Sequence, residues 1–356
     1  MHLTIQKKEV LTAAKTVKFI AKARATYATS LAYLSVSDRS LVIECDARDL
    51  SFNGSLKANI TEIGHLSVDP SEFFSAVNSL PTGEITIKSN GSYLVLSNST
   101  SNRKMLTHGT KDTPSNIIKG DLLQKIPSKY LTYLLDSTIY AASKDEYRSI
   151  SNVCLEVNGF RLKATGTDGI RLAHSYLRNP QEDTREKKLL LPRKSAVELN
   201  RFLKSCKEKY CNLYTTDDKL TVTTEKYTLS VRLSNDNFPD YEQVIPESSN
   251  YKVSVKRNLI LQTLKKLANK YYTILKLELS NNSLTLSLDG RSSESSIKID
   301  YHNDPKSVTL NGSLLKEAIT HLKGDMLTIS LSGELDPILI EQHSTNSCAV
   351  IMPIRP

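Results

Sequence analysis

The sequence lacks any long hydrophobic run. No apolar stretch in its 356 residues approaches the ~18 needed to cross a bilayer. The first seven residues also lack the apolar region of a secretory signal peptide. The chain has only five cysteines, which fits a reducing compartment. We therefore expect a cytoplasmic protein with no membrane-spanning segment.

Cysteine and histidine are too few and too scattered to indicate a metal site. Cys206 and Cys211 are five residues apart, which is a poor spacing for a zinc knuckle, and no second Cys or His pair completes a ligand set. Cys45, Cys154 and Cys348 lie in strand-like runs and are expected to be buried thiols. The sequence thus predicts no metal ion and no cofactor.

Signatures of catalysis are absent too. The chain has no glycine-rich phosphate loop and no G-x-S-x-G motif. Asp168 and Asp240, with His174 as a base, would support an alternative in which the protein is a nucleic-acid-processing enzyme. Aspartate in Asp-Gly and Pro-Asp steps is more typical of turns. We therefore expect a protein that is not an enzyme, and the enzyme remains the alternative of another class.

A repeat organises the chain. Apolar residues recur at helical spacing in six stretches, which begin near residues 7, 70, 128, 192, 256 and 312. Asp69 followed by Pro70 is a typical helix start, with an N-cap side chain and proline in the first turn. Since the starts are 56 to 64 residues apart, one structural unit appears six times.

Between the helical stretches the pattern alternates with period two, as in residues 220–223 and 284–288. Each copy is therefore a helix followed by three or four strands. One copy of about 60 residues buries too little surface to fold alone, so copies should pair. This predicts an α+β fold with domains at 1–119, 120–250 and 251–356. Turn-forming dipeptides predict hairpins at Asn53-Gly54, Asn90-Gly91, Asn158-Gly159, Asp168-Gly169 and Asp289-Gly290.

Four short motifs stand far apart in the chain. They are T-D-G-x-R-L-A at residues 167–173, P-R-K at 192–194, F-P-D-Y at 238–241 and M-P-x-R at 352–355. With these motifs, in this order and at about this spacing, the chain resembles the bacterial sliding clamp family, the beta subunit of DNA polymerase III. The resemblance runs from Met1 to Pro356.

The resemblance implies a ring. Clamps of this family have three domains per chain, each a pair of helix-plus-antiparallel-sheet repeats, and two chains close head to tail around duplex DNA. The homodimer would tether the DNA polymerase III catalytic subunit and confer processivity. An ATP-driven clamp loader would open it, because the chain itself has no nucleotide motif. The contact between the first and third domains would form the dimer interface, with Phe73, Phe74, Leu267 and Tyr272 expected there.

Basic charge is concentrated on the helical stretches. They carry +15 together, whereas the whole chain carries +9. Basic helices that line the hole of a ring would attract DNA phosphates without reading bases and would permit sliding. Lysine and arginine also favour solvated helix faces, and this alternative stays open. With the resemblance, we expect DNA contacts at Lys15, Lys18, Lys22, Arg24, Arg193, Lys194, Arg201, Lys204, Lys265, Lys266 and Lys270.

The resemblance also implies a cleft between the second and third domains, which in the family binds short linear peptides of polymerases, the loader and other partners with a clamp-binding motif. Arg171 and Arg355 could hold an acidic or carbonyl group there, while Met352 would adapt to varied ligands. From the residues alone, an ordinary domain seam is the alternative. Carried over by position, the cleft consists of Thr167, Gly169, Ile170, Arg171, Leu172, Pro239, Gln243, Val244, Asn311, Leu314, Val350, Met352, Pro353, Ile354 and Arg355.

Some positions depart from the family pattern. Members are usually acidic overall, whereas this chain carries +9. Ser151 stands about where the family has an apolar residue, Ile170 replaces a frequent His or Tyr, and Leu314 replaces a frequent Tyr. These changes leave a second possibility open, a clamp-fold paralogue that serves a mobile element or repair partners instead of the main replicase.

Overall fold

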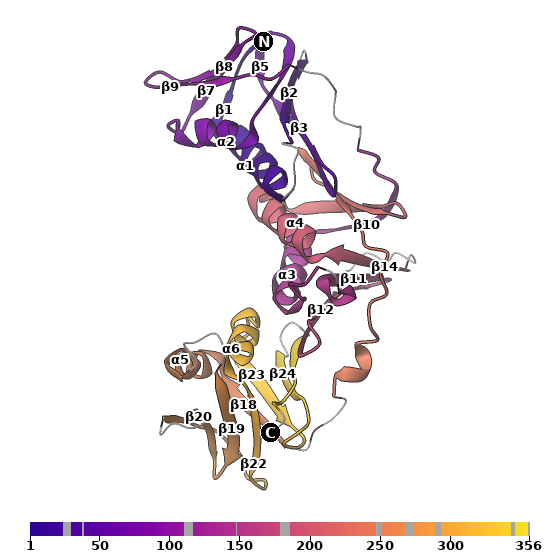
Figure 1. Cartoon of the computed structure of the whole chain (residues 1–356), viewed down its shortest axis with the longest axis vertical. Helices are drawn as coiled ribbons and strands as arrows, with labels where there is room; N and C mark the ends of the chain where they lie inside the picture. The colour runs from indigo at the N-terminus through magenta and orange to yellow at the C-terminus, as the bar shows by residue number, and fades with distance from the viewer. Residues whose placement is uncertain are drawn as a thin grey trace. The chain divides into compact units, whose positions relative to one another are not determined.

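The computed structural model of the chain (Figure 1) divides into two compact units. Unit 1 comprises Met1–Thr132 and Lys194–Leu233, and unit 2 comprises Tyr133–Arg193 and Ser234–Pro356. The structure describes residues 1–23, 30–37, 39–109, 117–146, 148–178, 186–246, 249, 251–267, 273–288, 293–342 and 346–354. Within these ranges, no helix has the length and apolar character needed to cross a membrane.

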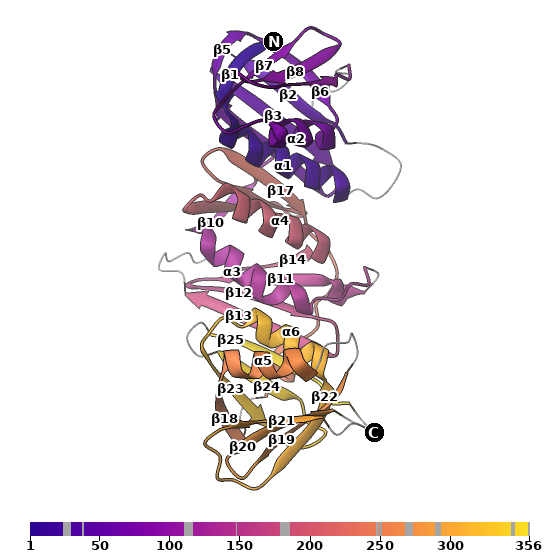
Figure 2. The same ribbon diagram turned by 90° about the vertical axis from the view of Figure 1, so that its left-hand side faces the viewer.

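Six α-helices occur in the described residues, and each begins within one residue of the predicted start. In unit 1, α1 and α2 lie side by side, as α5 and α6 do in unit 2 (Figures 1 and 2). Asp69 caps α2 as predicted, because its Oδ1 accepts from the backbone N–H groups of Ser71 and Glu72 at 2.8 Å. The helices are α1 (Lys7–Ala23), α2 (Pro70–Ser79), α3 (Ser128–Thr138), α4 (Arg193–Cys206), α5 (Arg257–Leu267) and α6 (Gly312–His321).

Unit 1 contains two antiparallel sheets within its described residues. The first has five strands in the order β5 (Asn59–Glu62), β1 (His2–Gln6), β7 (Glu84–Ser89), β8 (Tyr93–Ser97) and β9 (Asn102–Leu106). The second has eight strands in the order β10 (Asp121–Pro127), β15 (Tyr210–Thr215), β16 (Lys219–Thr223), β17 (Tyr227–Arg232), β4 (Leu50–Lys57), β3 (Ser40–Ala47), β2 (Ala32–Ser37) and β6 (Gly64–Val68).

Unit 2 repeats this plan in its described part. Its larger sheet has eight strands in the order β14 (Glu186–Pro192), β11 (Asn152–Asn158), β12 (Arg161–Thr167), β13 (Arg171–Arg178), β25 (Ser347–Ile351), β24 (Ile338–Gln342), β23 (Met326–Leu331) and β18 (Tyr251–Lys256). Its smaller sheet has four strands in the order β21 (Glu294–Lys298), β20 (Ser283–Leu288), β19 (Ile274–Ser280) and β22 (Lys306–Asn311). Short 3₁₀ helices are η1 (Ile139–Ala141), η2 (Ser149–Ser151) and η3 (Glu242–Val244).

The two large sheets continue across the predicted domain joints. In unit 1, β17 pairs with β4, and in unit 2, β13 pairs with β25. In each pair, a strand of the first or third predicted domain forms backbone hydrogen bonds with a strand of the second. The first and third domains therefore each share one sheet with half of the central region. The two compact units therefore divide the central region between them.

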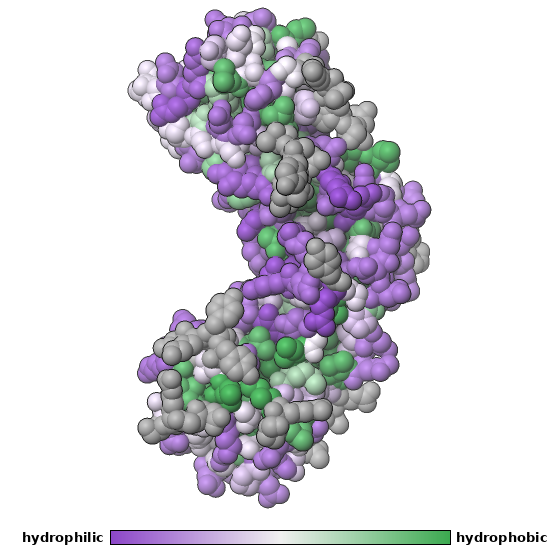
Figure 3. Space-filling model, in the orientation of Figure 1, coloured by the Kyte–Doolittle hydropathy of each residue, from purple (hydrophilic) through white to green (hydrophobic). Residues whose placement is uncertain are grey.

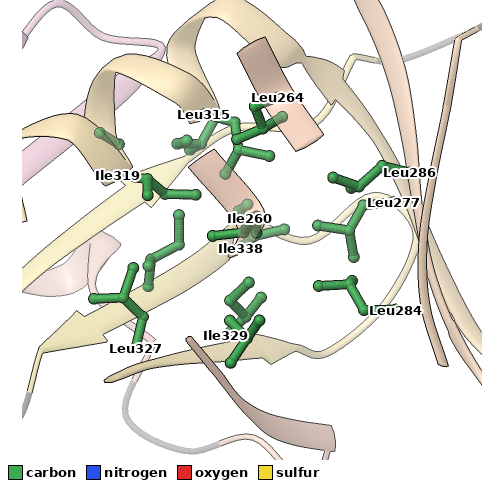
Figure 4. Packing of buried hydrophobic residues seen from close by; sticks show 14 of the residues in the cluster. Ile260, Leu264, Leu277, Leu284, Leu286, Leu315, Ile319, Leu327, Ile329 and Ile338 are labelled. Carbon is green, nitrogen blue, oxygen red and sulfur yellow. The ribbon is translucent and has the colours of Figure 1, made fainter. Parts of the chain in front are cut away.

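In the core of unit 2, the apolar residues that recur at helical spacing in the sequence pack against the sheets. Ile260 and Leu264 are four residues apart on α5, and so are Leu315 and Ile319 on α6; each pair forms one helix face. Figure 4 shows these side chains pointing toward Leu277 and other aliphatic residues of the sheets. Burial of one such side chain contributes about 1.5–3 kcal/mol. Truncation of Leu264 to alanine would therefore cost about 2–5 kcal/mol.

The predicted hairpins form at three places and fail at one. Asn90-Gly91, Asn158-Gly159 and Asp168-Gly169 join consecutive antiparallel strands. Asn53-Gly54 instead lies inside β4, and that prediction is wrong. A Cβ at Gly54 would lie 3.1 Å from the rings of Phe52 and Tyr227, so this glycine makes room for aromatic packing. Asp289-Gly290 lies outside the described residues.

All five cysteines lie in the described part of the chain and are free thiols. Cys45 and Cys154 are buried in strands, as expected, and burial raises the pKa of each thiol to about 12. Cys348 also lies in a strand, but it is only partly buried, which corrects the expectation for this residue.

Candidate functional site

The turn between β12 and β13 is held by its own side chains. Asp168 accepts from the backbone N–H groups of Ile170 and Arg171 at 3.0 Å through Oδ1. Thr167 Oγ1 donates to the carbonyl of Arg171 at 2.6 Å and accepts from the N–H of Gly169. Gly169 has φ +89°, a backbone angle that side chains rarely adopt. Asp168 therefore serves as a turn residue, as the motif chemistry predicted.

Arg171 follows the turn and is almost completely buried, with 8% of its surface exposed. Its Nε donates to Asp168 Oδ2 at 3.0 Å, one terminal nitrogen donates to Glu317 Oε2 at 2.5 Å, and the other donates to the carbonyl of Tyr140 at 2.7 Å. The guanidinium also lies over the Tyr140 ring, 5.3 Å from its centroid. The expectation that Arg171 offers its charge to a ligand is therefore corrected, because its three nitrogens already have partners.

Gly166, one residue before the motif, allows η1 to approach β12. A Cβ at this position would lie 2.4 Å from the carbonyl oxygen of Thr138, the residue before η1. Because the backbone comes this close, the carbonyl of Tyr140 reaches the guanidinium of Arg171. The small residue thus helps to fix the buried end of Arg171.

The F-P-D-Y segment packs against the same sheet, in a cluster with residues such as Leu172 and Val350. Phe238 and Tyr241 anchor it, with both rings buried and 6.2 Å apart in an edge-to-face arrangement. The hydroxyl of Tyr241 donates to Glu156. The Tyr241 ring also lies 5.4 Å from that of His174.

His174 lies against this segment as a half-buried residue. Burial lowers the pKa of its imidazole to about 4. Its Nδ1 is 2.9 Å from Thr165 Oγ1. The imidazole is therefore neutral at pH 7, and its packing against Tyr241 and its hydroxyl partner give it a structural role.

The end of the chain completes the site. Val350 pairs with Leu172 across β25 and β13. After the strand ends, the N–H of Met352 donates to the carbonyl of Ile170 at 2.9 Å, so the terminal segment follows the turn. Three segments that are far apart in the sequence therefore meet around one hollow.

This hollow is a cleft of about 240 Å³. Its walls are mostly aliphatic and aromatic, and Asp240 and Arg171 are its charged members. Nine of the lining residues were predicted from the sequence, and Ile150, Asp240 and Tyr241 were not. The lining consists of Ile150, Thr167, Gly169, Ile170, Arg171, Leu172, Pro239, Asp240, Tyr241, Val244, Val350 and Met352.

Ile150 resolves one apparent departure from the family pattern. Ser151 is buried and does not line the cleft, whereas Ile150 does. Both residues belong to the 3₁₀ helix η2, which brings the Ile150 side chain 3.7 Å from the Cβ position of Gly169. The apolar residue expected here is therefore present one position earlier.

Several predicted cleft residues do not line the hollow. Asn311 caps α6 by accepting from the N–H of Ser313 at 2.9 Å, and Leu314 packs against the core of unit 2. Gln243 donates to Asp240 at 2.7 Å from an exposed position. Pro353 and Ile354 follow Met352 but are not among the lining residues. Arg355 lies outside the described residues.

The sequence matches three family models in succession. They describe the N-terminal domain of the DNA polymerase III beta subunit over residues 1–115, the central domain over 125–240 and the C-terminal domain over 242–355. The chain belongs to the DNA polymerase III beta subunit family. It therefore contains three clamp domains, each with two helices and antiparallel sheets.

Relatives and solved structures agree over the full length. The beta sliding clamp of Pseudomonas aeruginosa is 26% identical over 377 residues, and that of Pseudomonas putida is 25% identical over 367; both comparisons cover 100% of each chain. A crystal structure of the Pseudomonas aeruginosa beta subunit has a TM-score of 0.89 at 24% identity and covers 100% of both chains. The Thermotoga maritima beta subunit has a TM-score of 0.88 at 20% identity and covers 100% of this chain and 99% of that chain.

The basic residues predicted on the clamp helices are exposed or half-exposed wherever they are described. Lys15, Lys22, Lys194, Arg201, Lys204, Lys265 and Lys266 are exposed, whereas Lys18 and Arg193 are half-exposed. The surface over α4 is mostly hydrophilic in the face shown (Figure 3). Arg24 and Lys270 lie outside the described residues.

Aromatic rings hold some of these basic side chains. Lys18 Nζ lies 4.1 Å from the centroid of Phe74, and the guanidinium of Arg201 lies 5.2 Å from that of Phe19. Arg201 also pairs with Glu198 at 2.6 Å. Its charge is therefore partly neutralised within α4, which sequence alone did not show.

The residues predicted for the dimer interface are differently placed. Phe73 is fully buried between α2 and the core of unit 1, so that prediction is corrected: its ring has no surface to offer a second chain. Leu267 is a member of the core of unit 2. Phe74 is half-buried beneath Lys18. Tyr272 lies outside the described residues.

Proposed function

We propose that two copies of the chain close head to tail into a ring around duplex DNA, and that the cleft tethers the replicative DNA polymerase to this ring. The observation that carries the proposal is the cleft itself, which forms where three motifs of the family meet. The exposed basic residues of α1 and α4 supply a surface that attracts phosphates without reading bases.

The walls of the cleft support a short apolar peptide as ligand. Ile170 and Val244 are 56% and 42% exposed, which is high for large aliphatic residues. Leu172 and Val350 are buried behind them, and Met352 is a flexible side chain that adapts to different ligands. Exposed aliphatic residues beside a hollow are typical of sites that bind a hydrophobic anchor.

Primer extension on circular DNA with the host DNA polymerase III catalytic subunit and clamp loader tests the proposal. Wild-type protein should lengthen the products, and Ile170→Asp should lose most of this effect because a charge replaces an apolar wall. Binding of a peptide from the polymerase should weaken about tenfold or more. Phe160→Asp is the matched control, because Phe160 is a comparably exposed apolar residue that does not line the cleft. Full activity of Ile170→Asp would contradict the proposal.

Two edge strands support a closed ring. In the described residues, β9 is the last strand of the five-stranded sheet and β21 is the last strand of the four-stranded sheet. An edge strand with exposed apolar residues tends to pair with another chain, and Leu106 at the end of β9 is 57% exposed. We propose that β9 of one chain pairs with β21 of the next, which replaces Phe73 as the centre of the interface. The ring would have twice the mass of the 39.7 kDa chain.

The wider role follows from this assembly. The clamp would perform no catalytic step, act in the cytoplasm, be opened by an ATP-driven loader and bind further partners through the same cleft. Its domains are proposed at 1–119, 120–250 and 251–356, and the ends of the first two family models at residues 115 and 240 support these limits.

A second candidate is a clamp of a mobile element or of repair proteins. The net charge of +9 and the aliphatic residue at Ile170 in the cleft favour it. The same extension assay separates the two candidates, because such a clamp would form rings on DNA without lengthening the products of the host polymerase.

A further inference from the structure

The charge at one corner of the cleft is set by a residue from another domain. Arg171 is the basic member of the lining among the described residues, and its side chain is 7% exposed. Glu317 comes from α6 in the C-terminal domain and contacts the guanidinium at 2.5 Å, with 45% of its own side chain exposed. Asp168 accepts from the same guanidinium at 3.0 Å. Two carboxylates therefore contact one buried cation.

The described charges around the cleft then leave a negative excess. The positive charge of Arg171 is balanced by Asp168 alone, and Glu317 adds a further negative charge that solvent can reach. Asp240 lines the cleft from the F-P-D-Y segment as an exposed carboxylate. A ligand that enters would meet aliphatic walls and the exposed carboxylate of Asp240. Glu317 lies just beyond the lining, against the guanidinium of Arg171, which already donates to protein acceptors.

We propose that Glu317 is a specificity-determining residue, which makes the cleft select apolar peptides with basic flanks over peptides with acidic flanks. This inference rests on the proposed function of the cleft as a peptide site. The physical reason is that like charges near one another repel, and that an arginine already engaged by two carboxylates has little attraction left for a third.

The experiment measures binding of fluorescent synthetic peptides of equal length to the full chain. The peptides share one apolar core of leucine and phenylalanine and carry flanks of lysine, serine or aspartate. We expect the wild type to bind the lysine-flanked peptide about fivefold more tightly than the aspartate-flanked one at low salt.

Glu317→Gln removes the charge and keeps an acceptor for Arg171. It should strengthen binding of the aspartate-flanked peptide and weaken binding of the lysine-flanked one, each about threefold, and leave the serine-flanked peptide unchanged. Glu278→Gln is the matched control, because Glu278 is also an ion-paired glutamate, 38% exposed and bound to Lys276 on β19. It should change none of the three affinities.

Three results are distinguishable. Equal weakening of all three peptides by Glu317→Gln would show that Glu317 only supports the shape of the cleft, and would overturn the inference. Tighter binding of the aspartate-flanked peptide by the wild type would overturn it as well. If no peptide binds and a polymerase peptide also fails to respond to Ile170→Asp, the proposed function of the cleft fails first.

Discussion

Gly166→Ala should destabilise unit 2 and weaken ligand binding in the cleft. The added methyl group would lie 2.4 Å from the carbonyl oxygen of Thr138 and 3.2 Å from the N–H nitrogen of Ala142. Since real Cβ atoms essentially never come closer than 3.0 Å, β12 and η1 must separate by at least about 0.6 Å, the difference between 3.0 and 2.4 Å. Both neighbours are backbone atoms and therefore have no side-chain rotamer through which to yield.

The magnitude follows from two contributions. Overpacking by one methyl group costs about 1–3 kcal/mol. Separation of η1 from β12 also lengthens the bond from Arg171 to the carbonyl of Tyr140, and a hydrogen bond to a charged group is worth about 1.5–3 kcal/mol. Replacement of glycine by alanine returns about 0.4–1 kcal/mol by restricting the unfolded chain. We expect the free energy of unfolding to fall by about 2–4 kcal/mol.

Urea unfolding followed by circular dichroism measures the change in the free energy of unfolding. Peptide binding at low temperature measures the affinity of the cleft for its ligand. Gly109→Ala is the control, because nothing lies within 4 Å of its Cβ position and its φ is ordinary; it should stay within about 0.5 kcal/mol of the wild type. Wild-type stability together with wild-type binding in Gly166→Ala would refute the argument that the close approach of η1 positions Arg171.

Three further predictions concern DNA, the ring and pH. Lys22→Glu should weaken binding to duplex DNA and reduce the slope of its salt dependence by about one, measured by fluorescence anisotropy, whereas Lys88→Glu on β7 should change neither. Leu106→Glu should convert dimers to single chains of 39.7 kDa in sedimentation. Ile118→Glu, at another exposed aliphatic residue, is the control and should leave the dimer intact. If the Leu106→Glu dimer persists, β9 is not part of the interface. Burial lowers the pKa of His174 from 6.5 to about 4, so the unfolded chain takes up the proton first and stability is lost as pH falls from 6.5 toward 4, by up to about 1.4 kcal/mol per pH unit. His174→Gln should show a shallower pH dependence in urea titrations at fixed pH values, and an identical dependence would assign the effect to other groups.

The helices were predictable because local signals specify them. Asp69 and Pro70 begin α2 through capping and a fixed φ angle, and the aliphatic residues on α5 and α6 recur with the helical period. The predicted start of α4 was one residue early. Pro192 still belongs to β14, where it pairs with Asn152, and this partner is 40 residues away in the chain. A boundary set by a distant partner has no local signal.

The strands were harder to delimit for the same reason. Asn53-Gly54 has the composition of a hairpin turn, yet it continues β4 because β17 from the central domain pairs alongside. The rings of Phe52, Phe202 and Tyr227 pack together there, with centroids 6.0–6.3 Å apart. Tertiary packing thus overrides a strong turn dipeptide.

The same distinction separates the cleft residues that were predicted correctly from those that were not. Motif residues that belong to strands and turns, such as Ile170 and Met352, were placed correctly because the backbone pairing of β13 and β25 fixes them. Asn311 and Leu314 were placed in the cleft by resemblance, but the first caps α6 and the second faces the core. Ile150 was missed because η2 shifts the apolar position by one residue, which a motif cannot show.

The charge of the cleft could not be read from the sequence at all. The motif contains an arginine, and an arginine beside an apolar wall indicates an acidic ligand. One of its partners, Asp168, belongs to the same motif, but the other two are 31 and 146 residues away, at Tyr140 and Glu317. Because a buried guanidinium must find such partners to offset its desolvation, the fold decides whether Arg171 attracts a ligand or stabilises a turn. Here its donors are already engaged, so ligand preference follows the carboxylates that remain exposed. The choice of partner in this clamp is thereby linked to α6, a helix that carries none of the four motifs.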